Sequence, residues 1–247
     1  MRSLAFLLAL PLSAQALPPT PDAAFFKGDA RQVMVACADR ALALKAKDSR
    51  LMAEYGRAFL AGGDRKRAEE TFERAVALDR KDGETYRLVA LAWLLNGFKA
   101  EALKVHQQML EADPRADRPQ KLAAIDLMQA GCLPEAEAMM AHVQQVAPKD
   151  TDNLKDFALA ALRAGHGDLG SRWAERAWEA DPKGLPRDWH DCFDLAMAAR
   201  QARMDDLAAR WFARTLAADP KEERMWNAVA LAFADPIAPA DGARAAR

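Results

Sequence analysis

Apolar residues along this chain recur every three or four positions in short segments, a spacing that places them on one face of an α-helix. Within residues 83–112, two such segments follow one another, with Tyr86, Val89, Ala90 and Trp93 in the first and Ala102, His106, Met109 and Leu110 in the second. Gly97 between them can adopt the left-handed conformation that ends a helix. Asp113 ends the second helix, because a residue before proline is pushed out of helical geometry. The pattern predicts two antiparallel helices joined by a tight turn.

Several sets of residues repeat along the chain with a step of 34 positions. The sets are Gly63, Gly97, Gly131 and Gly165; Pro114, Pro148 and Pro182; Ala68, Ala102, Ala136 and Gly170; and Gly56, Ala90, Ala124 and Ala158. Beyond residue 184 all but the first set resume four residues late, at Pro220, Ala208 and Ala196, which indicates an insertion at residues 185–188. Independent residue types that share one period predict a tandem array of helix pairs, which bury their apolar faces by stacking.

Period 34 with this pattern resembles the tetratricopeptide repeat family, whose repeats carry W-x2-L-G-x2-Y and A-x3-F patterns and a terminal proline. The repeats are residues 49–82, 83–116, 117–150, 151–184 and 189–222, followed by a half-repeat that ends near Phe233. The second repeat matches best, whereas Ala or polar residues replace large aromatic residues in the third and fourth. The resemblance covers residues 49–234 and implies an all-α, right-handed superhelical solenoid of five antiparallel helix pairs with capping helices at its ends.

The two ends of the chain differ from the repeats. Arg2 precedes a short apolar run from Leu4 to Leu10, and small residues stand at Ala14 and Ala16, which is the pattern of a secretory signal peptide. We expect residues 1–16 to be that signal peptide and the protein to be exported to the bacterial periplasm; a short helix retained in a cytosolic protein is the alternative. Residues 17–48 are predicted as a proline-rich linker and an N-terminal capping helix, and residues 223–247 as a C-terminal capping helix and a loose tail.

Composition and charge narrow the classes of function. The chain has 247 residues, 35 Lys and Arg against 36 Asp and Glu, and a net charge of -1. No basic excess therefore exists to drive binding of nucleic acid through counterion release. Three cysteines are too few for a disulfide-stabilised scaffold. Of these, Cys192 falls at a core position of a first helix, and Cys132, which follows a helix-ending glycine, is expected to be the most exposed and a free thiol.

The chemistry-bearing residues do not form a recognisable catalytic or metal-binding motif. The four histidines fall at four different positions of the repeat, and His190-Asp191-Cys192 lacks the paired second half that a zinc site needs. The sequence contains no G-x-G-x-x-G, Walker or G-x-S-x-G element. Adjacent carboxylates such as Glu69 and Glu70 lie on predicted helix surfaces. We therefore expect a non-enzymatic protein without a metal or cofactor.

The resemblance implies a binding site, because in the family the first helix of each pair lines a concave face. The groove positions carried over to this chain form one row, Arg57, Leu91, Ile125, Leu159, Met197 and Leu231, and a neighbouring row, Leu60, Leu94, Met128, Leu162 and Arg200. One helical turn before the first row come Arg87, Lys121 and Lys155, then Phe193 and Asn227, while Arg163 adds charge near the middle. These positions predict an apolar floor with a basic rim. The alternative is that the apolar rows are core, with the assumed phase wrong by one residue.

A groove of this composition fits a partner that presents apolar side chains from an extended segment or amphipathic helix, together with acidic residues that the basic rim would attract. We therefore expect a protein-interaction adaptor of the cell envelope whose partner is a protein or peptide, with no stable membrane span after cleavage. Two rival functions stay open. One is a structural role through self-association of solenoids, and the other is a carrier or accessory role in which the groove holds a lipid or polysaccharide.

Overall fold

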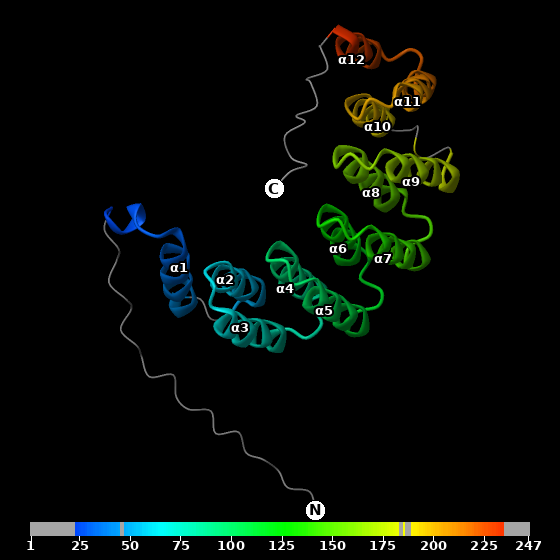
Figure 1. Cartoon of the computed structure of the whole chain (residues 1–247). Helices are drawn as coiled ribbons and strands as arrows, with labels where there is room; N and C mark the ends of the chain where they lie inside the picture. The colour runs from blue at the N-terminus through cyan, green and yellow to red at the C-terminus, as the bar shows by residue number, and fades with distance from the viewer. Residues whose placement is uncertain (1–22, 45–46, 183–184, 186–188, 235–247) are drawn as a thin grey trace, which may run out of the picture. The chain divides into compact units, whose positions relative to one another are not determined.

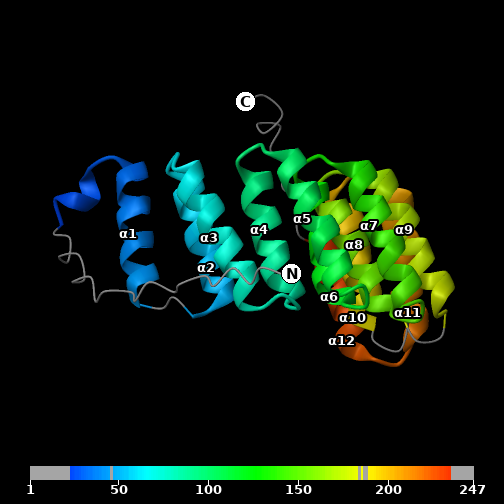
Figure 2. The same cartoon turned by 90° about the horizontal axis from the view of Figure 1, so that it is seen from below.

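The computed structural model describes residues 23–44, 47–182, 185 and 189–234, and these residues contain helices and no strand. The chain divides into two compact units, Met1–Asp79 and Arg80–Arg247. The first unit contains a short 3-10 helix, η1 (Phe25–Lys27), followed by α1 (Ala30–Leu44), α2 (Ser49–Ala61) and α3 (Arg65–Leu78). Figure 2 shows α1, α2 and α3 side by side, and α2 packs on both of the others.

The described residues of the second unit form four helix pairs and one further helix. Its helices are α4 (Gly83–Leu95), α5 (Lys99–Ala112), α6 (Asp117–Gln129), α7 (Leu133–Val146), α8 (Thr151–Arg163), α9 (Gly167–Ala180), α10 (Trp189–Gln201), α11 (Asp205–Ala218) and α12 (Glu223–Ala234). Within this unit, Figure 1 shows the first helices α4, α6, α8 and α10 along one side and their partners along the other. Each first helix packs on its own partner and on the next first helix. The predicted all-α helical-repeat solenoid, built from adjacent helix pairs, is therefore confirmed.

The first helices begin at regular positions, and in three of the five the aspartate before the helix caps it. They start at Ser49, Gly83, Asp117, Thr151 and Trp189, the first residues of the five repeats named above. Asp48, Asp82 and Asp150 each accept a hydrogen bond from a backbone N–H in the first turn of the helix that follows. Such a side chain satisfies a donor that has no partner within the helix, and aspartate is among the best residues for this position.

The turn inside each pair has the same backbone geometry throughout. Gly63, Gly97, Gly131 and Gly165 all have positive φ, between 75° and 90°. In the turn at Gly97, the N–H of Phe98 donates to the carbonyl of Trp93 at 2.9 Å, and the N–H of Gly97 donates to that of Leu94 at 3.0 Å. These are the two bonds of a Schellman helix end, which requires a left-handed residue. The fixed turn holds the two helices of each pair antiparallel.

Small residues let the paired helices approach each other closely. The positions predicted for close approach are buried, including Ala90 and Ala102 in the pair α4–α5. The clearest case is Gly170 of α9, where an added Cβ would lie 2.6 Å from Cγ of Leu162 on α8. The alanine-rich composition of the chain thus has a structural cause, because each pair needs small side chains where its helices cross.

A polar side chain near the start of several first helices fastens the preceding loop. Tyr86 Oη donates to the carbonyl of Arg80 at 3.2 Å, Gln120 Nε2 to that of Asp113 at 3.0 Å, and Trp226 Nε1 to that of Pro220 at 3.0 Å. The residues at this position are fourth in their helices. Each bond satisfies a carbonyl in the loop that joins one pair to the next helix.

Some expectations concern parts of the chain outside the described residues. The signal peptide, residues 1–16, lies there, and so does the predicted C-terminal tail after Ala234. Of the predicted insertion only Leu185 is described; it is buried, and its carbonyl accepts a hydrogen bond from Cys192 Sγ at 3.9 Å. The segment for which an N-terminal capping helix is predicted contains α1. None of the described helices is both long and apolar enough to cross a membrane.

Candidate functional site

The first helices of the second unit carry a row of apolar residues that stays partly open to solvent. Leu91 on α4, Ile125 on α6 and Met197 on α10 are half-buried, and Leu231 on α12 is exposed. Leu159 on α8, between them, is only 7% exposed. These residues come from the ninth positions of their helices and therefore lie on one side of the stack. Arg57, the corresponding residue of α2 in the first unit, is exposed and pairs with Glu54.

The second row of predicted groove residues lies in the core. Leu60, Leu94 and Leu162 are buried, and Met128 is fully buried. A step of three residues turns about 300° around a helix, which rotates this row away from solvent and toward neighbouring helices. Leu162, for example, packs on Gly170 of α9. For these four residues the alternative interpretation, a buried core row, holds, and they do not line an open groove.

Arg200, which continues that row on α10, differs from the buried residues. It is half-buried, and its guanidinium carbon lies 5.3 Å from the ring centroid of Phe233 on α12. A cation over an aromatic ring at this distance is attracted by the electron-rich ring face. Arg200 therefore helps to hold α12 on α10.

Arg87, the first residue of the predicted basic rim, is bound to two carboxylates. Its Nε and Nη2 donate to Glu84 at 3.0 and 2.6 Å, and its Nη1 donates to Asp126 of α6 at 2.6 Å. Burial would lower the pKa of Arg87, but the hydrogen bonds to Glu84 and the charge of Asp126 outweigh it, so the pKa is raised. Arg87 is therefore a charged connection between α4 and α6.

Lys121 and Lys155 connect the following first helices in the same way. Lys121 Nζ on α6 lies 2.6 Å from Asp156 Oδ2 on α8, and Lys155 Nζ on α8 lies 2.5 Å from Asp191 Oδ1 on α10. Lys155 also contacts Asp152, at 3.0 Å. Burial would lower the pKa of Lys155, but the hydrogen bonds to Asp191 and Asp152 outweigh the effect of burial, so the pKa is raised.

These ion pairs change the expected charge of the surface. Each of the three rim cations is already bound to at least one carboxylate on the next first helix, so the predicted rim carries no excess positive charge at these residues. Arg163, at the end of α8, is exposed. The acidic partners do not stand out in the sequence because they occupy three different positions of the repeat: Asp126, Asp156 and Asp191 are tenth, sixth and third in their helices. The 34-residue period alone therefore does not identify these three carboxylates.

One further apolar residue of this face was not anticipated. Leu95, at the end of α4, is 64% exposed. It lies four residues after Leu91 and therefore on the same side of the helix. That spacing could have identified it from the sequence. Together, Leu91, Leu95 and Ile125 form what we call the apolar row of α4 and α6.

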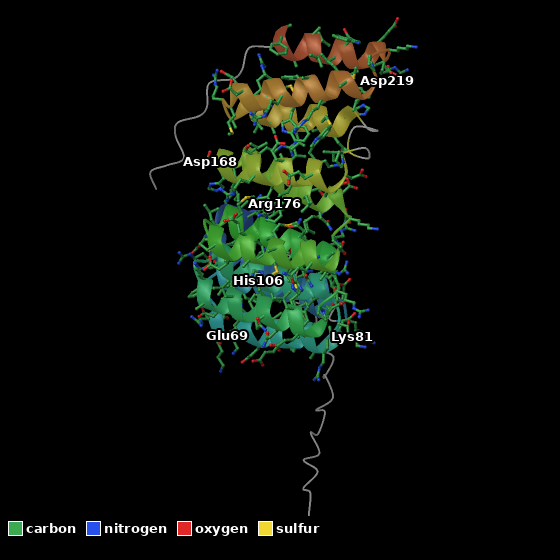
Figure 3. All side chains as sticks on the ribbon, turned by 90° about the vertical axis from the view of Figure 1, so that its right-hand side faces the viewer. Glu69, Lys81, His106, Asp168, Arg176 and Asp219 are labelled. Carbon is green, nitrogen blue, oxygen red and sulfur yellow. The ribbon has the colours of Figure 1, made fainter. Side chains whose placement is uncertain are left out.

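His106 is buried in the core of the α4–α5 pair (Figure 3), and neither of its ring nitrogens has a hydrogen-bond partner. Burial, and after it the charge of Arg87, lowers the pKa of His106 to about 4. The ring is thus neutral at pH 7 and occupies the place that Phe72 and Phe212 fill in other pairs. Among the described residues, no group of three or more His, Cys, Asp or Glu side chains could hold a metal ion.

The expectation for the cysteines needs a correction. Cys132 is only 5% exposed and is not the most accessible thiol. It stands directly before α7, where the turn folds it against the pair, and its Sγ lies 3.8 Å from the carbonyl of Ala130. Cys37 on α1 is the exposed cysteine, Cys192 is buried, and all three are free thiols.

Comparison with known proteins gives similarities to solved structures only. No protein-family model and no curated protein matches the chain. A structure titled "YrrB: a TPR protein with an unusual peptide-binding site" has 13% identity and a TM-score of 0.38, covering 79% of this chain and 99% of its own. The MamA RS-1 ArsTM double mutant has 16% identity and a TM-score of 0.39, covering 71% and 97%. PilF of Pseudomonas aeruginosa has 13% identity and a TM-score of 0.40, covering 84% and 87%.

Proposed function

We propose that the protein is a non-enzymatic interaction scaffold that binds a segment of a partner protein along the apolar row of α4 and α6. The observation that supports this most directly is the exposure of Leu95 at 64% beside the half-buried Leu91 and Ile125. Apolar side chains that line successive first helices, and that the core does not use, offer a surface for the apolar residues of an extended segment or an amphipathic helix.

The charges beside the row determine what kind of partner it selects. Arg87 is held by Glu84 and Asp126, and Lys121 by Asp156, so neither cation is available to a ligand without breaking an ion pair. We therefore propose that apolar contact supplies the affinity, while acidic residues of the partner contribute less than the sequence suggested. Binding through such a surface should depend only weakly on salt, because screening acts on exposed charges.

We also propose that the scaffold acts in the cell envelope. The support is the signal-peptide pattern in residues 1–16, with Arg2 before the apolar run and Ala14 and Ala16 before the expected cleavage site. Mass spectrometry of the chain recovered from a periplasmic fraction tests this, and we expect an N-terminus at Leu17. A chain that keeps Met1 and stays in the cytoplasm would contradict it.

The binding surface is tested by photo-cross-linking in cells. A photoreactive amino acid is placed at Leu95 or at Ile125, and at Ala138 on α7 as the control, because Ala138 is exposed on a second helix. We expect the first two positions to yield an adduct with the same polypeptide, identified by mass spectrometry, and Ala138 to yield none.

A variant then separates loss of binding from loss of folding. Leu95→Asp places a charge on an exposed site, so the helical circular dichroism and the unfolding midpoint should stay as in the wild type. The adduct formed from position 125 should fall at least about tenfold, since a charge within an apolar contact must be desolvated. Equal adducts from all three positions would contradict the proposal. A lipid or polysaccharide bound at positions 95 and 125 would support the carrier function instead.

A further inference from the structure

The last described helix, α12, exposes the face that every earlier first helix buries. Trp226 is 50% exposed and Phe233 is 63% exposed, and Ala230 between them is also exposed. The equivalent residues of α4 are Tyr86, Ala90 and Trp93, all of which are buried. In the four pairs of this unit, the second helix covers this face. Among the described residues, no second helix follows α12 (Figure 1).

The rest of the unit fixes α12 but leaves this face open. Phe233 contacts Phe212 of α11, with ring centroids 5.1 Å apart, and lies under Arg200 of α10. Trp226 is held by its hydrogen bond to the carbonyl of Pro220. Of the twelve residues of α12, only Met225 and Ala232 are buried. The helix is therefore positioned as the first half of a pair.

The preceding pairs show what covers such a face. In each, an antiparallel second helix covers the first helix, which carries a buried small residue on this face, such as Ala90 on α4. On α12 the small residue is Ala230. Counted in residues along the chain, Trp226 lies as far before the midpoint between Val229 and Ala230 as Phe233 lies after it. A second α12, related by a two-fold axis, is antiparallel by symmetry. In such a pair, Trp226 of each copy would lie opposite Phe233 of the other copy, and both Ala230 residues would lie at the crossing.

The charges of α12 allow a second copy as the occupant, and the exposed area limits how strongly it can bind. The charged residues of α12 are Glu223 and Arg224, both in its first turn, so two copies of the face meet without repulsion. A fully covered aromatic side chain buries roughly 150–250 Å², so covering the exposed parts of Trp226 and Phe233 in both copies buries on the order of 400 Å². Stable interfaces bury about 1,200 Å² or more, which indicates weak, concentration-dependent pairing.

We propose that α12 is a self-association site, where α12 of a second copy takes the place that a second helix has in the other pairs of this unit and forms a two-fold symmetric dimer. This goes beyond the proposed scaffold function and does not depend on it. The dimer leaves Leu91, Leu95 and Ile125, on α4 and α6, outside the self-association face of α12.

The test is sedimentation velocity on the full mature chain over a micromolar to millimolar series, with a reductant present because Cys37 is exposed. We expect the average mass of the wild type to rise with concentration toward that of a dimer. Ala230→Glu and Ala230→Lys should each raise the dissociation constant at least about tenfold, because like charges then face each other at the crossing. The control is Ala209→Glu, at an exposed site on α11, which should leave the dissociation constant unchanged.

Mixing the two charged variants distinguishes a symmetric pair from other contacts. An equimolar mixture of Ala230→Glu and Ala230→Lys chains should form dimers again, because opposite charges then meet at the crossing. A wild type that stays monomeric over the whole series would overturn the proposal, and so would a dimer that tolerates both variants. If removal of residues 236–247 turns a monomeric chain into a dimer, the C-terminal tail occupies the face in the native chain, and the proposal is wrong.

Discussion

Arg87 on α4 and Asp126 on α6 form an ion pair at 2.6 Å, and their side chains are only 13% and 12% exposed. A nearby pair, Lys121 with Asp156, has the same short distance of 2.6 Å, but the Asp156 side chain is 43% exposed. Two connections of equal length therefore differ in how far the acid is removed from water, and Arg87 in addition binds the partly exposed Glu84. That difference determines what happens when the cation is lost.

We predict that Arg87→Met lowers the free energy of unfolding by about 3 kcal/mol, because it leaves the buried Asp126 without its cation. Lys121→Met is the matched control and should lower it by less than about 1 kcal/mol, since water solvates the exposed Asp156. Urea denaturation followed by circular dichroism measures both. Equal losses in the two variants would show that burial of the acid does not govern the strength of these connections.

Arg203 provides a test of the repeat geometry. It stands where the other turns have glycine, with φ of 61°, and its N–H donates to the carbonyl of Arg200 at 3.0 Å as in a Schellman helix end. A left-handed conformation costs a non-glycine residue about 1–2 kcal/mol, while glycine loses more backbone entropy on folding. We predict that Arg203→Gly raises the free energy of unfolding by about 1 kcal/mol, measured by urea denaturation.

The reciprocal change is Gly165→Ala. An added Cβ at Gly165 would have no atom within 4 Å, so only the backbone conformation opposes the substitution. We expect a loss of about 1 kcal/mol. If Arg203→Gly destabilises the protein instead, the contacts of the Arg203 side chain must stabilise the fold by more than its left-handed backbone conformation destabilises it.

His106 should make the stability of the protein sensitive to acid. Its pKa is lowered to about 4 in the folded state, below the ordinary value of 6.5, so the unfolded chain binds more protons between these values. The contribution of His106 to the free energy of unfolding is therefore fully present above about pH 6.5. It is lost as the pH falls toward 4, by up to about 3 kcal/mol. We predict that His106→Phe removes this part of the pH dependence. It should also raise the free energy of unfolding at pH 7 by about 1 kcal/mol, because the buried imidazole, whose nitrogens have no hydrogen-bond partners, is replaced by an apolar ring.

Urea denaturation at a series of pH values between 4 and 7 measures this effect. Met140→Phe, at the same position of the next pair, is the control, because it changes the packing without removing a titratable group. Its dependence on pH should match that of the wild type. A His106→Phe protein that loses stability in acid as steeply as the wild type would show that other groups cause the loss.

The fold could be predicted from the sequence because it depends on local and repeated features. The glycines 34 residues apart mark turns that need positive φ, and the small residues mark helix crossings, so both can be found without knowing the structure. The site depends on which side of each helix faces water. One row of groove residues, which includes Leu91 and Ile125, is partly open, whereas Leu94 and Met128, three residues later, are core.

Ion pairs between helices also could not be predicted from the sequence. Arg87 and Asp126 are 39 residues apart, while Lys121 and Asp156 are 35 apart, so no single spacing identifies these partners. Whether two such side chains meet depends on their lengths and on the angle between adjacent helices. The basic rim was therefore predicted from the cations alone, and the carboxylates that neutralise it were found only in the structure.

Gly170 shows how local packing can override the repeat pattern. Its equivalents are Ala68, Ala102, Ala136 and Ala208, and alanine is the better helix former by about 1 kcal/mol, so the pattern alone recommends Gly170→Ala. In the structure, a Cβ at this position would lie 2.6 Å from Cγ and 3.0 Å from the backbone nitrogen of Leu162. We predict that Gly170→Ala lowers the free energy of unfolding by about 1 kcal/mol, because overpacking costs about 1–3 kcal/mol and exceeds the gain in helix propensity.

A double-mutant cycle with Leu162→Ala separates the causes of that loss. Leu162→Ala alone should destabilise the core by about 2–5 kcal/mol. In its presence, Gly170→Ala should cost clearly less than in the wild type, because the side chain that the new Cβ meets has been removed. Some loss should persist, since the backbone nitrogen of Leu162 stays in place. If Gly170→Ala instead stabilises the wild type, α8 and α9 can move apart to accept the methyl group, and their close contact does not determine which residue fits at this crossing.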